Sequence, residues 1–465
     1  MPRRPSMQYL ALDIGSSSIK GALLDLERLQ IGATIRRACP GPVSDLPPRH
    51  FEIDPHAVIR ATEEVVTELI ARADEPAGLV SCTQMAGTIL VDRQGQALTR
   101  YLSWRDQRVL DNQPTAATSY YDHLHAQLTD RQRAELGGEL KAGASTSLLY
   151  WLACQQQLPN GATPLGLGEY VWTRLCDSAP AVERTNALGA LDLTTGDWHH
   201  SVFAALDLPE LQWPRLVSPT EPIGTLSIAG HRLPCFPPLG DHQCALLGTR
   251  LAAGELSLNI STGSQISQLS DQLQLGSYQT RTYFDGQFLN SITHLPAGRS
   301  LDVLVQLVNQ LAREVSPNHD PWPAIARAVH DTPDTDLDVD LAFFAGPLGN
   351  RGSIGNIQIE NLNVGTLFRA AYRNMAENYR RCADQLCPAA DWQRLVLSGG
   401  LPQNSPHLLE AICEQFACAH RVCRGSEDTL WGLLIQSLVT CGQASSFQDA
   451  TQMIRQTFSG SMTDE

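Results

Sequence analysis

The sequence has no long run of basic residues and no excess of positive charge. Its 465 residues include 34 Lys and Arg against 49 Asp and Glu, which gives a formal net charge of −15 at pH 7. Nucleic acids and anionic membranes attract proteins through positive charge, so neither is an expected partner. A phosphate group can still be bound locally, because backbone N–H groups can supply the positive field.

Long apolar runs are also missing. No window of about 18 uncharged apolar residues occurs, and a helix needs about that length to cross a membrane. The first residues, "MPRRPSMQYLALDIG", are positively charged, but the apolar run that follows is interrupted by Asp13 and lacks a small-residue cleavage site. We interpret this stretch as a short tail and not as a signal peptide.

Paired-cysteine motifs are absent although the chain has 12 cysteines. No Cys-x-x-Cys occurs, and cysteines spaced by five, such as Cys382 and Cys387, lie in apolar context. Free buried thiols in a reducing cytoplasm are the favoured interpretation, and a zinc site is the weaker alternative.

Two familiar phosphate-transfer signatures are missing as well. The chain contains no Gly-x-x-x-x-Gly-Lys-Ser/Thr, which excludes a P-loop enzyme. The segment "SWRDQR" lacks the His-Arg-Asp context and no Asp-Phe-Gly occurs, which excludes a protein kinase. Any phosphate chemistry must therefore use other loops.

What the chain does have is length, apolar residues and regular alternation. Its 465 residues suit two domains of roughly 200–250 residues each. A composition of 43% apolar and 18% charged residues suits large cores. Strand-like and helix-like segments alternate, with helices expected over Pro55–Ala73 and Val364–Leu386. We expect an α/β protein with mixed sheets, divided near residue 250 into domains 1–250 and 251–465.

A hairpin with a small-residue loop opens the chain and recurs in its second half. The first is "YLALDIGSSSIKGALLDL" and the second is "LNISTGSQISQL". Tight turns of small residues can bind a phosphate through their backbone N–H groups. For the first loop alone, a polar turn with Asp13 capping local N–H groups is the favoured interpretation. Two such loops in duplicated halves favour a polyphosphate ligand instead, with Asp13 holding hydrated Mg²⁺ beside it.

Two further segments carry candidate chemistry. The run "RLVLSGG" predicts a strand that ends at Gly399 and Gly400, followed by a helix from about Ser405. This turn suits a nucleotide base or ribose, or is an ordinary strand-to-helix turn. Asp241 begins a helix-like run, where a carboxylate is commonly an N-cap. At a domain junction it could instead accept a proton from a substrate hydroxyl, as phosphoryl transfer to an alcohol requires.

In this order, the segments resemble the FGGY carbohydrate kinases, a branch of the sugar kinase/actin/Hsp70 superfamily. The matching stretches are "LALDIGSSSIKGALLD", "QM" with "WRDQR", "GDHQ", "LNISTGSQIS" and "LVLSGGLPQNSP", which span residues 9 to about 432. The resemblance implies two duplicated actin-like (ribonuclease H-like) domains around a central cleft. The N-terminal one is expected to bind the sugar and the C-terminal one the adenosine. It also implies that ATP with Mg²⁺ phosphorylates a sugar or polyol hydroxyl.

The resemblance assigns roles to individual residues. Asp241 is the expected general base and, with Asp13, a metal ligand, while His242 is expected to be a structural neighbour of the base. The expected sugar-binding residues are Gln84, Met85, Trp104, Asp106, Arg108 and Asp241. The expected nucleotide- and phosphate-binding residues are Asp13, Gly15, Ser16, Ser17, Lys20, Ser261, Thr262, Gly263, Gly399, Gly400 and Asn404.

Asp106 and Arg108 also have a simpler interpretation. Without the resemblance they would form a surface ion pair beside a core tryptophan. On a strand, their spacing of two places them on one face, where they could pair or both reach sugar hydroxyls. The resemblance favours sugar contact more strongly for Asp106 than for Arg108.

The identity of the sugar rests on a few positions. Pentulose kinases of this family commonly have Gln-Met-His-Gly where this chain has "QMAG", so Ala86 replaces an imidazole. The run "LNIST" looks most like the sedoheptulokinase branch. The resemblance therefore favours sedoheptulose, phosphorylated at its C7 hydroxyl, with xylulose, ribulose or glycerol as alternatives.

A non-catalytic nucleotide-binding regulator of the same fold is the alternative from another class. The presence of Asp241 argues against it, since a binding module needs no base. The expected partners are a small-molecule sugar and ATP, without nucleic acid or membrane. The oligomeric state is left open, with a homodimer as one option.

Overall fold

The computed structural model describes residues 7–114, 117–208, 211–315, 320–423, 425 and 427–458. The chain forms two compact units that are discontinuous in sequence. Unit 1 contains the chain up to Arg250, and also Asp271–Phe288 and the stretch from Glu427. Unit 2 contains Leu251–Ser270 and Leu289–Ser426. Of the first 15 residues, interpreted above as a short tail, residues 1–6 lie outside the described residues, whereas Gln8–Ile14 form a strand.

The predicted division at residue 250 coincides with the end of the first segment of unit 1. Two later stretches, which the sequence assigned to the second domain, also belong to the contact network of unit 1. The reason is long-range packing. The helix α13 (Asp428–Thr440) lies against α7 (Asp241–Gly248), and Gly432 lies so close to the carbonyl oxygen of Cys244 that an added Cβ would be 2.0 Å from it.

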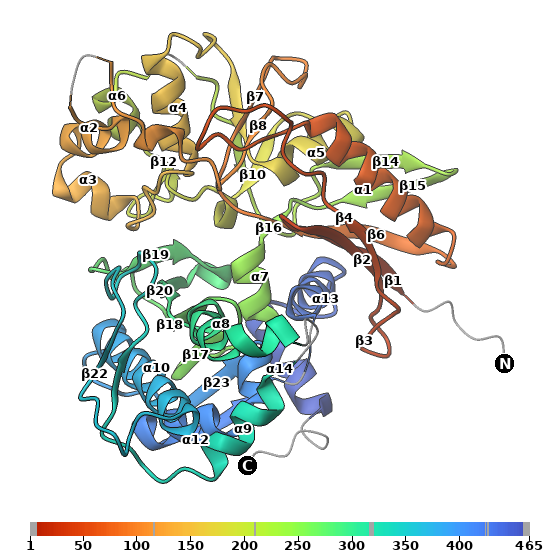
Figure 1. Cartoon of the computed structure of the whole chain (residues 1–465). Helices are drawn as coiled ribbons and strands as arrows, with labels where there is room; N and C mark the ends of the chain where they lie inside the picture. The colour runs from red at the N-terminus through yellow and green to blue at the C-terminus, as the bar shows by residue number, and fades with distance from the viewer. Residues whose placement is uncertain are drawn as a thin grey trace, which may run out of the picture. The chain divides into compact units, whose positions relative to one another are not determined.

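Unit 1 is built on a mixed sheet in the order β14-β15-β6-β1-β2-β3, with β16 also pairing with β6 and β4 with β2. Every residue of β1 after the first is buried, because α1 packs on one face of the sheet and α13 on the other (Figure 1). The strands are β1 (Gln8–Ile14), β2 (Ser18–Asp25), β3 (Gln30–Ile31), β4 (Ile35–Ala38), β6 (Pro76–Thr83), β14 (Gly224–Ile228), β15 (His231–Cys235) and β16 (Leu239–Gly240). The larger helices are α1 (Pro55–Ile70), α4 (Ser145–Cys154), α5 (Leu167–Leu175), α7, α13 and α14 (Phe447–Phe458).

Unit 2 repeats the central part of this arrangement. The strands β20, β18, β17, β23 and β24 follow one another in a sheet. As β1 does with β2 and β6, β17 pairs antiparallel with β18 and parallel with β23. The elements are β17 (Glu255–Ile260), β18 (Ser264–Ser270), β20 (Phe288–Leu295), β23 (Arg394–Ser398), β24 (Ala419–Val422), α8 (Gly298–Val315), α9 (Trp322–His330), α10 (Val364–Leu386), α11 (Gly400–Asn404) and α12 (Pro406–Phe416).

The two predicted helices are present. The helix α10 has the predicted bounds, and its first turn is closed by a reciprocal capping box between Asn363 and Thr366. The helix α1 begins at the predicted Pro55 but ends at Ile70, before the predicted Ala73. All twelve cysteines lie in the described part of the chain and are free thiols, as predicted, but only seven of them are buried, and Cys154 is exposed.

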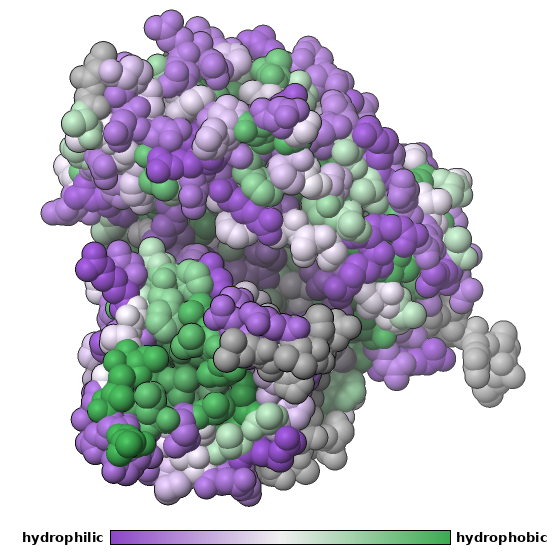
Figure 2. Space-filling model, viewed as in Figure 1, coloured by the Kyte–Doolittle hydropathy of each residue, from purple (hydrophilic) through white to green (hydrophobic). Residues whose placement is uncertain are grey.

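The exposed large apolar side chains concentrate in unit 2. Figure 2 shows an apolar area over the part of this unit that holds α8. Contiguous apolar surface is typical of a contact area for partners or ligands. Among the described helices, none combines the length and hydrophobicity that crossing a bilayer requires. The exposed apolar residues of unit 2 are Val303, Leu307, Phe344, Ile357, Ile359, Leu362 and Val364.

Candidate active site

The first small-residue loop, residues 15–17, is the turn of the β1–β2 hairpin. The backbone N–H of Gly15 donates to the carbonyl oxygen of Ser18 at 3.1 Å, and a Cβ at Gly15 would lie only 3.1 Å from that oxygen. Arg105 Nη2 donates to Ser16 Oγ at 3.2 Å. A residue with a side chain would therefore be crowded at the start of this turn, which explains the glycine.

Asp13 lies at the end of β1, and only 6% of its surface is exposed. Its Oδ2 atom lies 3.3 Å from Lys20 Nζ and accepts a hydrogen bond of 2.9 Å from Thr429 Oγ1. Lys20 Nζ also lies 3.4 Å from Glu427 Oε2. Burial alone would lower the pKa of Lys20, but the Asp13 and Glu427 carboxylates outweigh burial and raise this pKa. The site thus holds a cationic charge between two carboxylates.

Glu427 and Thr429 are site residues that sequence reasoning missed. They flank the start of α13, more than 400 residues after Asp13 in the chain. The only signal was the run "EDT", with two acidic residues and one hydroxyl residue at the start of an apolar helix. Such a run is equally typical of an ordinary helix N-terminus.

Asp241 is the first residue of α7 and directly follows β16. The strand β16 runs parallel to β6, with Gly240 paired to Thr83, and β6 runs parallel to β1, with Cys82 paired to Asp13. Because the carboxyl ends of parallel strands meet at one edge of a sheet, Asp13, Gln84 and Asp241 are brought to the same edge of unit 1. The sequence order gave no direct sign of this juxtaposition.

Burial, reinforced by the negative charge of Asp13, raises the pKa of Asp241 to about 7. Backbone N–H groups and the Arg281 guanidinium act in the opposite direction. A carboxylate with a pKa near neutrality is suited to accept a proton at physiological pH. Two mutually repelling carboxylates at a sheet edge also suit a divalent cation, which would offset the repulsion.

A chain of buried polar side chains leads away from Asp241. Arg281 Nη1 lies 2.6 Å from Nδ1 of His242, the residue after Asp241, and Arg281 Nε donates to Glu139 Oε1 at 2.6 Å. Because arginine only donates, His242 Nδ1 is the acceptor and its proton lies on Nε2. Burial and the Arg281 charge lower the pKa of His242 well below its usual value, so its imidazole is neutral. Sequence reasoning missed Glu139 and Arg281.

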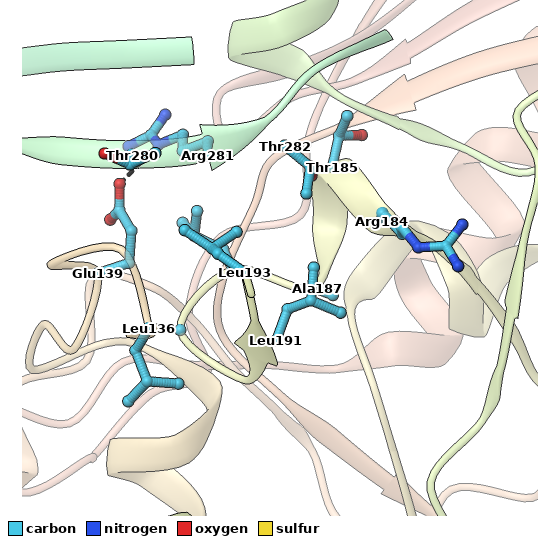
Figure 3. Close-up of a pocket in the computed structure, with 12 residues that line it drawn as sticks. Leu136, Glu139, Arg184, Thr185, Ala187, Leu191, Leu193, Thr280, Arg281 and Thr282 are labelled. Carbon is cyan, nitrogen blue, oxygen red and sulfur yellow. Dashed lines mark hydrogen bonds and ion pairs between the residues drawn. The ribbon is translucent and has the colours of Figure 1, made fainter. Parts of the chain in front are cut away.

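A small cavity lies beside this chain (Figure 3). Glu139 and Arg281 form one side of it, Thr185 and Thr282 another, and leucine side chains close it. Its volume of about 10 Å³ has room for one water molecule. In this conformation the cavity does not accommodate a sugar. The apolar residues that line it are Leu136, Ala187, Leu188, Leu191 and Leu193.

Of the predicted sugar-binding residues, Gln84 has unused hydrogen-bonding capacity. Its side chain is 3% exposed, and both its Nε2 and Oε1 atoms are without a hydrogen-bond partner among the described residues. A buried amide without partners is costly unless a ligand or water supplies them. Met85 lies against Gly240, where an added Cβ would be 2.4 Å from its sulfur. Met85 therefore lies against the residue that precedes Asp241, and Gln84 directly follows Thr83, which pairs with Gly240.

Asp106 and Arg108 have little such capacity left. Asp106 is fully buried and Arg108 is 3% exposed. They form two side-chain hydrogen bonds of 2.9 and 2.7 Å with each other, and Arg108 Nη2 also donates to Glu52 Oε1 at 2.7 Å. The segment is a turn followed by a short 3-10 helix and not a strand. The ion pair is buried and not on the surface, whereas Trp104 is 41% exposed and not a core residue.

In unit 2 the second small-residue loop, residues 261–263, joins β17 to β18. The backbone N–H groups of Gly298 and Arg299, at the start of α8, donate to the carbonyl oxygens of Ser261 and Thr262 at 3.0 and 2.8 Å. This fixes the loop while Ser261, Thr262 and Gly263 stay exposed. The three residues are therefore accessible to solvent, although the backbone N–H of Ser261 donates to the carbonyl oxygen of Gly263 at 3.0 Å.

The paired glycines follow β23, the parallel neighbour of β17, so both loops lie at the same edge of the unit 2 sheet. Gly399 has φ 92°, and a Cβ there would lie 2.2 Å from the carbonyl oxygen of Ile260. Asn404 Nδ2 donates to Gly400 O at 2.7 Å and closes the short helix α11. The predicted helix begins at Pro406, with α11 as an additional turn before it.

Gly399 is a test position for this turn. If the turn binds nucleotide, as the resemblance implies, we expect Gly399→Ala to weaken ADP binding by at least about 10-fold, because the added methyl group must move the end of β17 or the glycine turn. Gly41→Ala, in unit 1, is the control, since nothing lies within 4 Å of its added Cβ. Isothermal titration calorimetry with ADP measures both. Equal affinities of the two variants would contradict a role for this turn in nucleotide binding.

The fold defines a class of proteins. A xylulose kinase from Rhodospirillum rubrum superimposes with a TM-score of 0.82 at 19% identity, covering 96% of this chain and 92% of that chain. A glycerol kinase from Plasmodium falciparum with ADP gives 0.82 at 17% identity, covering 97% and 92%. At these identities the likeness establishes the fold, which is the actin-like two-domain fold of sugar kinases.

The family follows from the sequence match. The model of the N-terminal domain of the FGGY family of carbohydrate kinases matches residues 8–248, more than half of the chain. This chain therefore belongs to the FGGY family of carbohydrate kinases. An autoinducer-2 kinase from Photorhabdus laumondii is 28% identical over 232 residues, 48% of this chain and 41% of the relative. A glycerol kinase from Alkalilimnicola ehrlichii is 27% identical over 270 residues, 51% and 50% respectively. The matched region is thus half or less of these curated relatives.

Proposed function

We propose that this protein is an ATP-dependent carbohydrate kinase that transfers the γ-phosphoryl group to a hydroxyl of a ketose. The observation that carries the proposal is the position of Asp241. Its carboxylate lies at the same sheet edge as Asp13 and Gln84 and has a pKa of about 7. Membership of a carbohydrate kinase family supports the reaction class.

In this proposal Asp241 accepts the proton of the attacking hydroxyl. Gln84 orients the sugar with its unpartnered amide group, next to Met85. The neutral His242 presents an Nε2–H donor that is without a hydrogen-bond partner among the described residues, and Arg281 fixes this tautomer. These groups position the hydroxyl and take up its proton, which is the protein's part in phosphoryl transfer to an alcohol.

Within each unit, separate residues are proposed to contact the metal or the nucleotide. Asp13 and Asp241 are the proposed ligands of Mg²⁺, which when bound would neutralise phosphate charge. Oδ2 of Asp13 is engaged by Lys20 and Thr429, which leaves Oδ1 for the metal or its water. In unit 1, Gly15, Ser16, Ser17 and Lys20 would contact phosphate. In unit 2, Ser261, Thr262 and Gly263 would contact phosphate, and Gly399, Gly400 and Asn404 the adenosine.

Sedoheptulose, phosphorylated at C7, is the proposed substrate. The "LNIST" run and Ala86 in place of a histidine support it. The names of the relatives support the wider class of ketose and polyol kinases, which includes xylulose and glycerol kinases. The twelve free thiols and the use of ATP support a cytoplasmic location. A homodimer remains one option for the assembly.

A coupled assay of ADP release tests the function and the substrate together. The panel contains sedoheptulose, xylulose, ribulose and glycerol, each with Mg²⁺ and ATP. We expect ADP release that depends on the sugar and is fastest with sedoheptulose. Faster release with another sugar would overturn the substrate but keep the kinase. ATP binding without release for every member would favour a non-catalytic regulator.

The raised pKa of Asp241 predicts the pH dependence. We expect kcat/KM for the sugar to rise with pH and to level off above pH 7, because the base must be ionised. Arg281 lowers this pKa, so the double variant Glu139→Gln/Arg281→Gln should move the acidic limb to higher pH. Because both partners of the buried ion pair are changed, neither charge is left buried without its partner. An unmoved limb would contradict the electrostatic role of Arg281.

A further inference from the structure

Three side chains of unit 1 that have no part in the proposed reaction converge behind the wall of the cavity. Glu135 ends α3 (Asp130–Glu135), Asp192 ends β11 (Leu191–Asp192), and His199 precedes α6 (His200–Ala205). One ligand atom of each, a carboxylate oxygen or a ring nitrogen, lies within 4.8 Å of the other two. Three separate elements therefore contribute to one small polar centre.

His199 points its Nε2 atom into this centre without a hydrogen bond at that atom. Its side chain is 3% exposed, and Nε2 has no hydrogen-bond partner among the described residues. Glu135 Oε2 lies 3.2 Å from Nε2, which is close enough for a hydrogen bond. The two groups are not oriented toward each other, however, so no hydrogen bond forms. Two ligands of one tetrahedral zinc ion lie about 3.3 Å apart and point at the ion instead of at each other. His199 Nε2 and Glu135 Oε2 have this spacing, and they likewise do not point at each other.

The other atoms of the three residues are already engaged. His199 Nδ1 lies 3.3 Å from Ser201 Oγ, which suits a proton on Nδ1 and a free lone pair on Nε2. Asp192 Oδ1 accepts hydrogen bonds of 2.8 and 2.6 Å from Thr194 N and Oγ1. Glu135 Oε1 accepts one of 2.6 Å from Arg131 Nε, on an exposed side chain. Supporting contacts of this kind orient metal ligands.

We propose that Glu135, Asp192 and His199 bind a divalent transition-metal ion of the Zn²⁺ class. One imidazole and two carboxylates form a borderline donor set that suits Zn²⁺ better than Mg²⁺ or Ca²⁺, which prefer oxygen ligands alone. Water would complete the coordination, since Asp192 is only partly buried.

The proposed role of the ion is structural and not catalytic. The residues next to these ligands, Leu136, Leu191 and Leu193, line the cavity (Figure 3). The backbone N–H of Leu193 donates to the carbonyl oxygen of Glu135 at 3.0 Å. A metal ion would therefore tie together the segments that form this wall. The phosphoryl transfer proposed above does not use the ion, so the two proposals can fail separately.

The test is a titration of the chelator-treated full-length protein with ZnCl₂ alone. Competition with a colorimetric zinc indicator measures affinity and stoichiometry, and thermal unfolding measures the effect on stability. We expect one tightly bound ion per chain and a rise in the unfolding midpoint of at least about 2 °C at saturation. His199→Gln and Asp192→Asn should each weaken this binding by at least about 10-fold.

Two neighbours are matched controls. His200 and Asp197 are exposed, and Asp197 faces Asp192 in the β11–β12 ladder, where β12 is Asp197–Trp198. His200→Gln and Asp197→Asn should leave zinc binding unchanged. Equal loss in the controls, or an unfolding midpoint that does not respond to ZnCl₂ in the unsubstituted protein, would overturn the proposal. The second result would identify the centre as a histidine–carboxylate ion pair. Should His199→Gln fail to fold, Asp192→Asn decides.

Discussion

Replacing Asp241 with asparagine is expected to lower sugar-dependent turnover by about 10²–10⁴-fold, the usual contribution of a positioned general base. The amide keeps the shape of the side chain but cannot accept the hydroxyl proton. ADP binding should be preserved, because the expected adenosine residues belong to unit 2. The coupled ADP-release assay measures turnover, and calorimetry measures ADP binding. Turnover within a few-fold of the unsubstituted protein would contradict the assignment of Asp241 as the base.

The same substitution should stabilise the protein at high pH. The folded-state pKa of Asp241, about 7, lies above its usual value of 3.8, so the folded protein holds a proton that the unfolded chain has released between these pH values. The ionised carboxylate therefore costs folding free energy above pH 7, and this cost disappears below about pH 4. We expect Asp241→Asn to add up to about 4 kcal/mol at pH 8, from a difference of about 3 pKa units, and nothing at pH 4.

An exposed aspartate at another helix start provides the control. Asp130 is the first residue of α3, and its side chain is fully exposed. Asp130→Asn should change neither turnover nor the pH dependence of urea-induced unfolding. A stability gain at pH 8 in both variants would reflect the net charge of −15 and not the environment of Asp241.

Replacing Asp13 with asparagine is expected to lower kcat/KM for Mg-ATP by about 10- to 100-fold, the size of effect seen when metal-site residues are altered. The variant should also need more Mg²⁺ for half-maximal activity. Because the Asp13 charge raises the pKa of Asp241, its removal should move the acidic limb of the pH profile to lower pH. A merely structural role for Asp13 would not produce that shift.

Thr429→Val is the matched control for Asp13. It removes the 2.9 Å hydrogen bond to Asp13 Oδ2 but leaves the carboxylate charge and the contact with Lys20. We expect a smaller loss of activity and an unmoved pH profile. Equal Mg²⁺ dependence in Asp13→Asn and the unsubstituted protein would contradict a metal-binding role for Asp13.

Local patterns in the sequence predicted the elements of the fold well. The repeated strand–small loop–strand pattern predicted both hairpins, and β1–β2 and β17–β18 have equivalent places in the two units. Periodicity predicted the exact bounds of α10, because its apolar face and capping box are both local. The return of Asp271–Phe288 and of the chain from Glu427 to unit 1 was not predicted. Such returns depend on packing between distant segments, which no local pattern encodes.

The site was predicted in part for the same reason. Asp13, Gln84 and Asp241 are found together because three parallel strands end side by side. Their roles stay predictions until they are measured. Arg281 and Thr429 were missed because they come from the returning segments. The prediction that Asp106 and Arg108 could share a face assumed a strand, whereas the two residues pair within a turn, where Asp106 Oδ1 also accepts from the backbone N–H of Arg108.

Phosphorus NMR of the full-length protein with Mg-ATP and sedoheptulose tests the central claim most directly. The account predicts that the γ-phosphate signal is lost only when sugar is present, and that a sugar phosphate ester appears in equal amount with ADP. Release of inorganic phosphate instead of an ester, or an unchanged ATP spectrum with every sugar of the panel, would contradict it.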